Sequence, residues 1–533
     1  MSKINTDMHR ILKERFNHDT FRPGQSDIIS SVLSGTDTLA VLPTGGGKSL
    51  CYQLPALMFK GLTIVVSPLI ALMQDQVDSL HNAGIEALLL NSALDWDTYC
   101  VNMDLVRSGV VKLLFCAPET LSTGRMQDLL AGIEVSCLAI DEAHCISEWG
   151  HDFRPDYNSL STIRNLFPKA VCLALTATAT PKVRKDIKDS LGLKNCTEFV
   201  GSFNRPNIFL EVTPKWRKKE GGANLQVEQF LEEHMNESGI IYCFSRKQVD
   251  ELSAYLKRKH FFVLPYHAGL SSEKREKNQQ KFICGKVDII VATVAFGMGI
   301  NKSDVRFVLH YDLPKSLEQY YQEIGRAGRD GKPAHALLLY TYADTRKINF
   351  FIDEKSGVEY DSAKEQLRGM IEYCESKGCR RKVLLAHFGE KYESYESETT
   401  KDSKQSGCRS CDICMGGKSV NVDVTIPVQK LLSCIIRTNE RYGAGYVIDV
   451  LLGSRQKRII ENKHNKLSTW GIGKEYSKDD WFQIVQLLIE EGFLRKSSDY
   501  NVLSLTQDAR DSLSERAIVM LPFVPSGKTG GLK

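Results

Sequence analysis

The sequence has no long apolar run and no marked excess of charge of one sign. Its longest uncharged apolar stretch is residues 61–74, whereas a membrane-spanning helix needs about 20 apolar residues. The opening residues, MSKINTDMHRILKERF, lack the apolar core of a secretory signal. Lysine and arginine exceed aspartate and glutamate by only 69 − 65 = +4. A membrane or secreted protein is therefore not expected, and any nucleic-acid site must be built from local basic patches.

Cysteine is too sparse for a fold held by disulfides. The 533 residues contain 15 cysteines, well below the roughly 8–10% of a disulfide scaffold. Most stand singly in apolar runs, as buried thiols do in a reducing compartment. We therefore expect a cytoplasmic, nucleoid-associated protein if the source is bacterial, and a nuclear protein if it is eukaryotic. The exception is the group Cys408, Cys411 and Cys414, in which three thiols stand close together.

The length and the hydrophobic pattern predict several domains. At about 150 residues per domain, the chain has room for three or four. Residues 35–200 repeat a short β-branched run, a polar turn and a helical stretch, and the pattern restarts at residue 239. Continuous apolar strands that alternate with helices predict parallel sheets covered on both faces. The fold class is therefore α/β, with two lobes and a boundary near residues 205–220.

The C-terminal third has a different pattern. After residue 345 the strand signal fades and helical periodicity takes over, and residues 391–407 read as a solvated loop. A further globular unit follows, with helical stretches at 428–443 and 481–492 and a possible hairpin at 493–505. Helices followed by a β-hairpin are typical of a winged helix-turn-helix.

A glycine-rich turn after the first strand predicts a phosphate site. In LAVLPTGGGKS (39–49) a strand leads into three glycines and Lys48-Ser49. Backbone N–H groups of such a turn surround a phosphate, Lys48 reaches the β- and γ-phosphates, and the Ser49 hydroxyl binds Mg²⁺. The match is to GGGKS after a strand, because Leu42 stands where the full pattern has a glycine. A glycine-rich turn with an incidental lysine is the alternative.

Two further motifs fit nucleotide hydrolysis. CLAIDEAHC (137–145) is an apolar strand that ends in two carboxylates, where Asp141 can bind Mg²⁺ through water and Glu142 can orient the attacking water. Far along the chain, YYQEIGRAGRDG (320–331) places Arg326 and Arg329 in a glycine-rich segment. Such arginines stabilise charge that develops on a γ-phosphate. Together the motifs predict hydrolysis that depends on closure of the two lobes.

These motifs, in this order, resemble those of superfamily 2 helicases, and more specifically of the RecQ family of ATP-dependent DNA helicases. The resemblance rests on TGGGKS, SPLIALMQDQ, DEAH, TATAT, YHAGL, ATVAFGMGINKSDVR and QEIGRAGRDG, and it covers roughly residues 10–515. Two segments are specific to the RecQ family: FRPGQ (21–25) resembles its adenine-reading motif, and SEWGHDFRPDY (147–157) its aromatic-rich loop. The resemblance implies ATP-driven 3′-to-5′ translocation on single-stranded DNA and duplex unwinding in repair, recombination and replication.

The resemblance also implies a domain order and a set of site residues. The expected domains are two RecA-like lobes at 1–207 and 208–345, a helical zinc-binding subdomain at 346–418, a winged-helix (RQC) domain at 419–518 and a tail at 519–533. Thr176 and Thr178 would link ATP hydrolysis to DNA binding. The expected catalytic residues are Lys48, Asp141, Glu142, His144, Arg326 and Arg329, and ATP is expected to contact Arg22, Gln25, Thr44, Gly45, Gly46, Gly47, Lys48 and Ser49. The expected DNA contacts are Ser67, Pro68, Gln74, Trp149, His151, Phe153, Arg154, Thr293 and Tyr500.

A structural zinc is expected at the cysteine cluster. CRSCDIC (408–414) has CxxCxxC spacing, and tetrahedral Zn²⁺ needs four ligands. Cys379 matches the first zinc cysteine of the family, with Cys374 and His387 as rivals for that place. An iron–sulfur cluster is the chemical alternative, but the run lacks a fourth nearby cysteine and a following proline.

The expected partners are DNA species. They are single-stranded DNA with a 3′ overhang at the lobes and duplex DNA at the winged helix, where residues 453–466 hold five lysines and arginines against one glutamate. A solvated charged face is the alternative for this segment. Tyr500, in the hairpin, could stack on a terminal base pair. A single-strand-binding protein is a further candidate partner, and a monomer without membrane association is expected. The rival functions are an RNA helicase or duplex translocase, and an ATP-switched winged-helix regulator.

Overall fold

The computed structural model describes residues 3–90, 96–150, 152–216, 221–296, 302–392, 407–415, 422–497, 502–515 and 517–521. The chain forms two compact units, Met1–Met415 and Gly416–Lys533, and each is described by itself. Among the described residues, no helix is long and apolar enough to cross a membrane.

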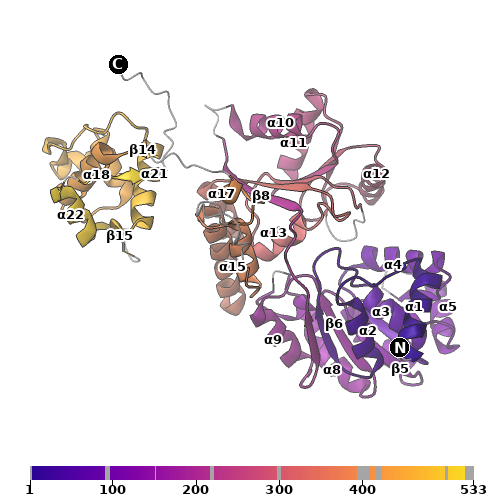
Figure 1. The fold of residues 1–533 in the computed structure, drawn as a ribbon. Helices are drawn as coiled ribbons and strands as arrows, with labels where there is room; N and C mark the ends of the chain where they lie inside the picture. Colours follow the sequence, from indigo (N-terminus) through magenta and orange to yellow (C-terminus); the bar gives the residue numbers. More distant parts are fainter. Residues whose placement is uncertain are drawn as a thin grey trace, which may run out of the picture. The chain divides into compact units, whose positions relative to one another are not determined.

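Lobe 1 is built on a seven-stranded parallel sheet in the order β3-β4-β2-β5-β6-β1-β7 (Figure 1). Its strands are apolar on both faces: Leu39 and Val41 belong to one buried cluster, whereas Ala40 between them belongs to another. This burial on both sides follows from the alternation of side chains along a strand. The strands are β1 (Thr38–Val41), β2 (Leu62–Val66), β3 (Ala87–Leu90), β4 (Leu113–Cys116), β5 (Val135–Ile140), β6 (Val171–Thr176) and β7 (Thr197–Val200).

Helices cover the sheet of lobe 1. Several begin with a local signal: Thr123 and Thr180 each cap a helix through a side-chain oxygen, and Pro181 occupies the first helical turn. The helices are α1 (Lys3–Phe16), α2 (Gln25–Leu33), α3 (Leu50–Met58), α4 (Ile70–Asn82), α5 (Trp96–Arg107), α6 (Pro118–Leu121), α7 (Gly124–Leu130), α8 (Leu160–Leu166) and α9 (Pro181–Ser190). Of two short 3-10 helices, η1 (Ala143–Ile146) precedes the aromatic-rich segment 147–157, and η2 (Pro155–Ser159) begins within it.

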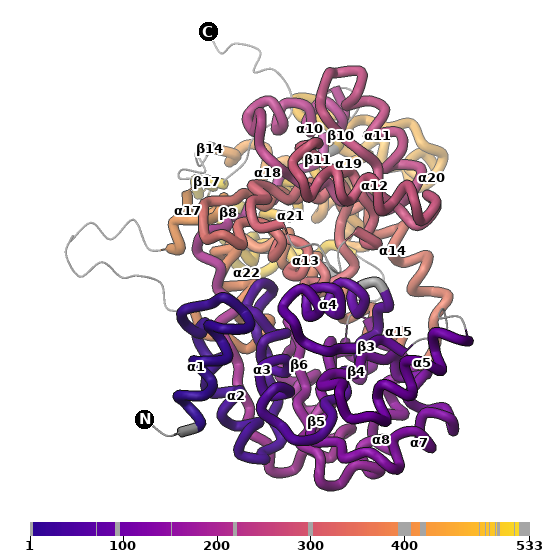
Figure 2. The backbone as a smooth tube through the Cα atoms, turned by 90° about the vertical axis from the view of Figure 1, so that its right-hand side faces the viewer, coloured from indigo at the N-terminus to yellow at the C-terminus, as the bar shows by residue number. Residues whose placement is uncertain are grey.

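Lobe 2 repeats the architecture with a six-stranded parallel sheet in the order β10-β11-β9-β12-β13-β8. In Figure 2 it lies above lobe 1, in magenta to salmon against indigo and purple. Its strands are β8 (Ile208–Pro214), β9 (Gly239–Tyr242), β10 (Val263–Tyr266), β11 (Ile289–Ala292), β12 (Phe307–His310) and β13 (Ala334–Tyr340). Its helices are α10 (Gly222–Glu233), α11 (Arg246–Arg258), α12 (Ser272–Ile283) and α13 (Leu317–Ile324). The two parallel-sheet lobes confirm the predicted fold class.

The apolar runs in the sequence predict five strands per lobe, fewer than the sheets contain. The three strands that the runs miss, β3, β7 and β8, all lie at sheet edges. An edge strand has a partner on one side only, so it can be short and partly exposed. In β7 buried and exposed positions alternate. The charged, glycine-containing sequence of residues 213–224 predicts a hinge or surface turn, but in the structure this stretch overlaps the end of β8 and the start of α10.

A helical segment follows lobe 2 and packs on the edge of its sheet. It contains a short 3-10 turn η4 (Tyr342–Asp344) and helices α14 (Thr345–Ile352), α15 (Gly357–Glu375), α16 (Arg380–His387) and α17 (Asp412–Met415). Cys411 forms a parallel bridge to Leu210 of β8, and the Leu210 N–H donates to the Ser410 carbonyl at 3.1 Å. The cysteine-rich turn therefore pairs with the edge strand of the lobe 2 sheet through a single bridge.

The second unit has the helices and hairpin expected of a winged helix. Strands β15 (Leu494–Lys496) and β16 (Leu503–Leu505) pair in antiparallel fashion, which confirms the predicted hairpin; Tyr500 lies outside the described residues. Trp481 is fully buried, and its indole N–H donates to the Gly473 carbonyl at 2.7 Å. The other elements are α18 (Thr425–Arg437), α19 (Ala444–Leu451), α20 (Lys457–Glu461), η5 (His464–Lys466), α21 (Lys478–Glu490), α22 (Gln507–Glu515), β14 (Val422–Asp423) and β17 (Met520–Leu521).

Candidate active site and zinc centre

The glycine-rich turn joins β1 to the N-terminus of α3. Gly45 and Gly47 have φ angles of +82° and +77°, which side chains rarely adopt. At Gly46, a Cβ atom would lie 2.9 Å from the Pro43 carbonyl oxygen. The turn therefore requires glycine at all three positions, and it leaves Lys48 and Ser49 at a helix N-terminus, where backbone N–H groups attract anions.

A cavity of about 230 Å³ lies between the turn and lobe 2. The predicted phosphate-binding residues other than Gly46 line it from lobe 1 together with the two carboxylates, and both predicted arginines line it from lobe 2. The structure thus brings three distant motifs together around one cavity. Its lining is Thr44, Gly45, Gly47, Lys48, Ser49, Leu72, Asp141, Glu142, Ala177, Gln322, Arg326 and Arg329.

A second cavity, of about 580 Å³, adjoins the other side of the turn. Arg22 and Gln25, the predicted base contacts, line it together with Gly45 and Gly47. The Gln25 side-chain amide donates to the Gly47 carbonyl at 2.9 Å and accepts from the Arg22 backbone N–H at 2.8 Å. The Arg22 guanidinium donates to the Gly45 carbonyl. The FRPGQ segment is therefore tied directly to the phosphate turn.

The two carboxylates stand at the end of β5 in different surroundings. Asp141 is buried, and its carboxylate accepts the Glu142 backbone N–H at 3.0 Å. Burial and the adjacent Glu142 charge raise the pKa of Asp141 to about 6, with Lys48 opposing the shift. Glu142 has a φ of +47°, an uncommon backbone conformation for a residue with a side chain. Such strain persists where the surrounding structure holds it, as at many functional sites.

A chain of polar contacts leads from Glu142 to lobe 2. The His144 Nδ1 atom lies 3.3 Å from a Glu142 carboxylate oxygen and 2.9 Å from the Thr176 hydroxyl. Thr176 in turn accepts the Thr178 backbone N–H at 3.2 Å, and the Gln322 side-chain amide of lobe 2 donates to the Thr178 hydroxyl at 3.1 Å. Gln322 lies inside the QEIGRAGRDG motif, but sequence reasoning assigned a role only to the arginines there.

The ring of His144 is a strong base in this setting. Burial opposes its charged form, but the neighbouring Cys145 and Glu142 outweigh burial and raise the pKa of His144 to about 10. The Nδ1 atom of this ring faces both the Glu142 carboxylate and the Thr176 hydroxyl.

The two arginines enter the cavity from the segment after α13. Arg326 is buried. Burial, together with the nearby charges of Arg326 and Arg205, lowers the pKa of Arg329 to about 10. A cluster of guanidinium groups beside Lys48 makes this cavity suited to an anion with several negative charges.

The predicted DNA contacts of lobe 1 are tied to one another. The Arg154 guanidinium donates to the Pro68 carbonyl at 2.9 Å and pairs with Asp152 at 3.2 Å. Lys182 lies over the Trp149 ring, and the Trp149 carbonyl accepts from Gln366 of α15 at 3.1 Å.

The remaining predicted contacts differ in exposure. Ser67 is 2% exposed, so its hydroxyl is not presented to solvent in this structure, whereas Phe153 and Thr293 are partly exposed. Gln74, on α4, donates from its side-chain amide to Asp78 at 2.8 Å. His151, like Tyr500, lies outside the described residues.

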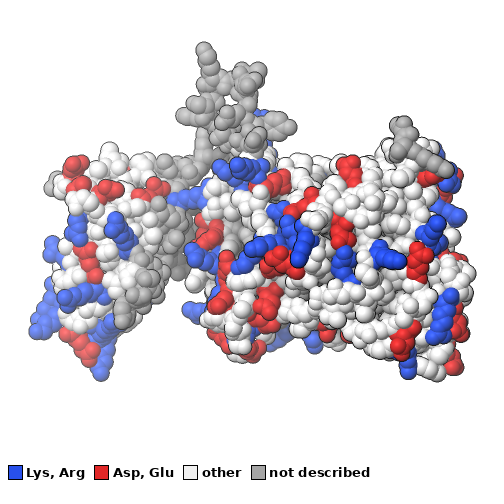
Figure 3. Space-filling model, turned by 90° about the horizontal axis from the view of Figure 1, so that it is seen from below, with Lys and Arg blue, Asp and Glu red and all other residues white. Residues whose placement is uncertain are grey.

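The surface charge is mixed. On the face in Figure 3, basic and acidic side chains alternate across the first unit. This agrees with the net charge of +4.

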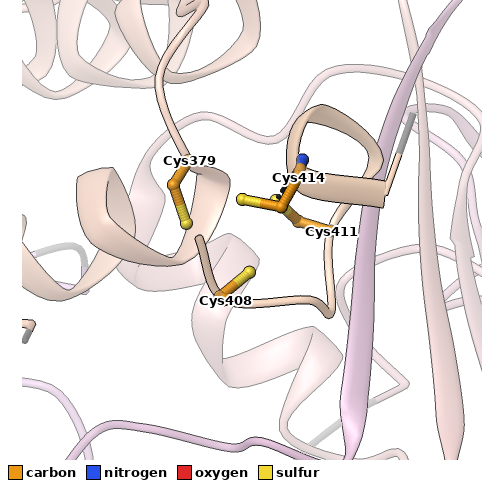
Figure 4. Close-up of side chains that lie close together, drawn as sticks. All are labelled: Cys379, Cys408, Cys411 and Cys414. Carbon is orange, nitrogen blue, oxygen red and sulfur yellow. Dashed lines mark hydrogen bonds between the residues drawn. The ribbon is translucent and has the colours of Figure 1, made fainter. Parts of the chain in front are cut away.

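The four predicted zinc cysteines converge. The sulfur atoms of Cys379, Cys408, Cys411 and Cys414 all lie within 4.8 Å of one another (Figure 4). Hydrogen bonds from the thiols of Cys408 and Cys411 lower the pKa of Cys379, so the cluster favours a thiolate, the form that binds metal. Four thiolates at this spacing fit a tetrahedral Zn²⁺ site.

The two rival ligands lie outside this cluster. Cys374 is buried in the apolar core, where burial raises the pKa of its thiol, and the His387 ring is bonded to the Glu318 carboxylate at 2.6 Å. A glycine is required beside the cluster, since a Cβ atom on Gly407 would lie 2.6 Å from the Cys414 sulfur.

The chain matches four family models, which together span most of its length. They are the DEAD/DEAH box helicase model over residues 22–187, the helicase conserved C-terminal domain over 223–331, the RecQ zinc-binding model over 342–415 and the RQC domain over 418–529.

Curated proteins match nearly the whole chain. The ATP-dependent DNA helicase RecQ of Haemophilus influenzae is 44% identical over 94% of this chain and 78% of its own length. The protein of the same name from Bacillus subtilis is 39% identical over 92% of this chain and 81% of its own length.

Solved structures show the same fold at low identity. The helicase Lhr of Mycobacterium smegmatis, bound to single-stranded DNA and AMP-PNP, superposes with a TM-score of 0.52 at 16% identity over 96% of this chain and 61% of that one. The DUF1998 helicase MrfA bound to DNA gives 0.54 at 18% identity, over 65% and 53%.

Proposed function

The chain belongs to the RecQ family of ATP-dependent DNA helicases, and from this premise we propose how its residues carry out the reaction. The proposed activity is 3′-to-5′ translocation along single-stranded DNA, driven by ATP hydrolysis, which separates duplexes during repair, recombination and replication. The observation that carries the proposal is the cavity between the lobes, where Lys48, the two carboxylates and both arginines meet.

The cavity is the proposed site of hydrolysis. Thr44, the glycines and Lys48 would hold the phosphates, while Ser49 and, through water, Asp141 would hold Mg²⁺. Glu142 orients the attacking water, and Arg326 and Arg329 stabilise the charge that develops on the γ-phosphate. Arg22 and Gln25 bind the adenine base in the adjoining cavity. Because the same two side chains donate to the Gly45 and Gly47 carbonyls, they connect the base to the phosphate turn.

The chain of polar contacts from Glu142 to Gln322 supports a route between ATP hydrolysis and movement of the lobes. It runs from the Glu142 carboxylate, which would orient the attacking water, to His144. From there it continues through Thr176 and Thr178 to Gln322 of lobe 2. A rotation of lobe 2 would strain the bond from Gln322 to Thr178 first. His144 is therefore proposed to act as a positioning group that holds Glu142 when the lobes are closed.

DNA is the proposed partner at two places. Single-stranded DNA contacts the two lobes through Pro68, Gln74, Thr293 and the loop that carries Trp149, His151, Phe153 and Arg154. Ser67 is left out of this set because its hydroxyl is buried in this structure. Duplex DNA binds the winged helix, where Tyr500 is proposed to stack on a terminal base pair. A single-strand-binding protein as partner, a monomeric state and a location with the chromosomal DNA are parts of the same proposal.

The polarity is tested with three tailed duplexes. With ATP, displacement is expected from a duplex with a 3′ single-stranded DNA tail, and at least about tenfold less from one with a 5′ tail or an all-RNA duplex. Lys48→Ala, which removes the positive charge that faces the phosphates, should abolish displacement. Displacement from the 5′ tail alone would contradict the polarity. Hydrolysis without strand separation would favour a translocase or an ATP-switched regulator instead.

The raised pKa of Asp141 predicts a pH dependence. A carboxylate must lose its proton to bind Mg²⁺, and the pKa of Asp141 is about 6 instead of 3.8. Asp141 is therefore mostly deprotonated, and able to bind Mg²⁺, above pH 6. Below pH 6 the apparent Mg²⁺ affinity should fall about tenfold per pH unit. Mg²⁺ titrations of ATP turnover from pH 5 to 8, corrected for the Mg²⁺ affinity of ATP alone, measure this. An affinity that stays constant down to pH 5 would rule out the assignment.

A further inference from the structure

The segment between the lobes, residues 202–208, is held by two arginines, one partly buried and one buried. One is Arg205, which belongs to the segment itself, and the other is Arg381, on α16 of the zinc-binding segment. Arg381 is 3% exposed, and burial lowers the pKa of Arg205. Removing a guanidinium from water is costly unless its N–H groups find acceptors. The hydrogen-bond acceptors of these two arginines show which parts of the chain the segment connects.

Arg205 bonds to backbone on both lobes. Its guanidinium donates to the Thr44 carbonyl in the phosphate turn at 3.5 Å, and to three carbonyls of lobe 2: Gly325 at 3.3 Å, Ala327 at 2.9 Å and Gly328 at 3.0 Å. These three residues flank Arg326 and immediately precede Arg329. Arg205 therefore fixes the backbone from which both proposed transition-state arginines extend.

Arg381 in turn holds Arg205. Its guanidinium donates to the Arg205 carbonyl at 2.8 Å, to the Asn204 side-chain oxygen at 2.9 Å and to the Ile208 carbonyl at 2.7 Å. It also reaches the Ser410 carbonyl, at 3.5 Å, next to the zinc cysteines. One side chain thus joins the metal-binding turn to the segment between the lobes.

Two further residues at the end of α16 complete the contact. The Glu390 carboxylate accepts the Phe203 backbone N–H and the Ser202 hydroxyl, both at 2.6 Å. The Phe388 ring stacks on the Phe203 ring with centroids 4.4 Å apart and planes 8° from parallel. The zinc-binding segment therefore holds residues 202–208 in place through hydrogen bonds from and to charged side chains and through one aromatic stack.

We propose that Arg381 and Arg205 form a relay through which the zinc-binding segment positions Arg326 and Arg329 for ATP hydrolysis. The inference rests on the proposed function and extends it, because it assigns the zinc-binding segment a part in turnover as well as in folding. Neither arginine of the relay lines the phosphate cavity, so both are positioning residues.

The relay is tested by a double-mutant cycle on the full chain, with Arg205→Met, Arg381→Met and the double variant. DNA-stimulated kcat should fall about 10- to 100-fold for Arg205→Met, since small displacements of catalytic groups cost this much, and about tenfold for Arg381→Met. KM for ATP should change less than about threefold, and zinc content should stay at that of the wild type. Because the two act in series, the double variant should be no slower than Arg205→Met.

Three controls separate positioning from folding and from charge. Arg368→Met, at a side chain on α15 that is 80% exposed, should leave kcat unchanged. Arg205→Lys keeps the charge but not the forked geometry, so it should remain within about threefold of Arg205→Met. If Arg381→Met does not fold, Asn204→Ala, which removes one acceptor of Arg381, replaces it in the cycle.

The outcomes distinguish the relay from the proposed function. Independent losses that multiply in the double variant, or loss of zinc from Arg381→Met, would overturn the relay. So would full rescue by Arg205→Lys, or wild-type kcat in both single variants. A wild-type chain without DNA-stimulated hydrolysis would instead refute the proposed function.

Discussion

Replacing Glu142 by glutamine is expected to lower DNA-stimulated ATP turnover by about 10²- to 10⁴-fold, the usual contribution of a positioned general base. The amide keeps the size of the side chain but cannot accept a proton from the attacking water. It also weakens the link to His144, whose ring lies 3.3 Å from the carboxylate. ATP binding should persist, because the phosphate turn and Lys48 are untouched. Steady-state turnover and equilibrium nucleotide binding, measured on the same preparation, separate the two effects.

A matched control lies at the opposite end of the same strand. Glu134 is exposed and immediately precedes β5, so Glu134→Gln makes the same chemical change away from the cavity. It should keep wild-type turnover. If Glu142→Gln also kept it, the water would have to be oriented by another group, and the assignment of the carboxylates would fail.

Loss of the metal site should have the second large effect, on folding. Cys411→Ser removes one of four sulfur ligands at a fully buried position next to β8. Structural zinc binds with roughly 10–16 kcal/mol in isolated zinc fingers, comparable to the 5–15 kcal/mol that stabilises a typical domain. We expect zinc content to fall from about one per chain to near zero and the segment from α14 to α17 to lose its structure. Metal analysis and hydrogen exchange of residues 345–415 measure both.

Cys284→Ser is the corresponding control, because Cys284 is exposed. It should retain zinc and the same exchange pattern. A Cys411→Ser protein that keeps a full equivalent of zinc would mean that the metal has other ligands. Iron in the purified chain instead of zinc would favour the iron–sulfur alternative.

The sequence predicts the interior of both sheets because buried parallel strands must be apolar throughout. It misses strands β3, β7 and β8, since edge positions relax that requirement. It also predicts the residues around the phosphate cavity, because the turn and the strand end impose local demands on residue type. Asp141 is an example: its place after an apolar run is legible in the sequence, but its raised pKa depends on burial by the whole lobe.

The contacts between segments could not be predicted. Arg205 and Arg381 lie in segments far apart in the sequence, and each bonds mainly to backbone carbonyls, which every residue type provides. No pairing of complementary side chains therefore marks them. Gln322 was visible within a motif, but its bond to Thr178 exists only because the two lobes meet. The left-handed backbone of Glu142 likewise has no signature in the sequence.

Coupling of hydrolysis to unwinding is measured by following ATP consumption and strand separation together on a DNA duplex with a 3′ single-stranded tail. Wild-type protein should separate the strands only while ATP is being hydrolysed. AMP-PNP in place of ATP, or the Glu142→Gln variant, should leave the duplex intact although the protein still binds it. Separation at an undiminished rate with AMP-PNP, or sustained hydrolysis with an intact duplex, would contradict a helicase in which lobe closure and hydrolysis drive unwinding.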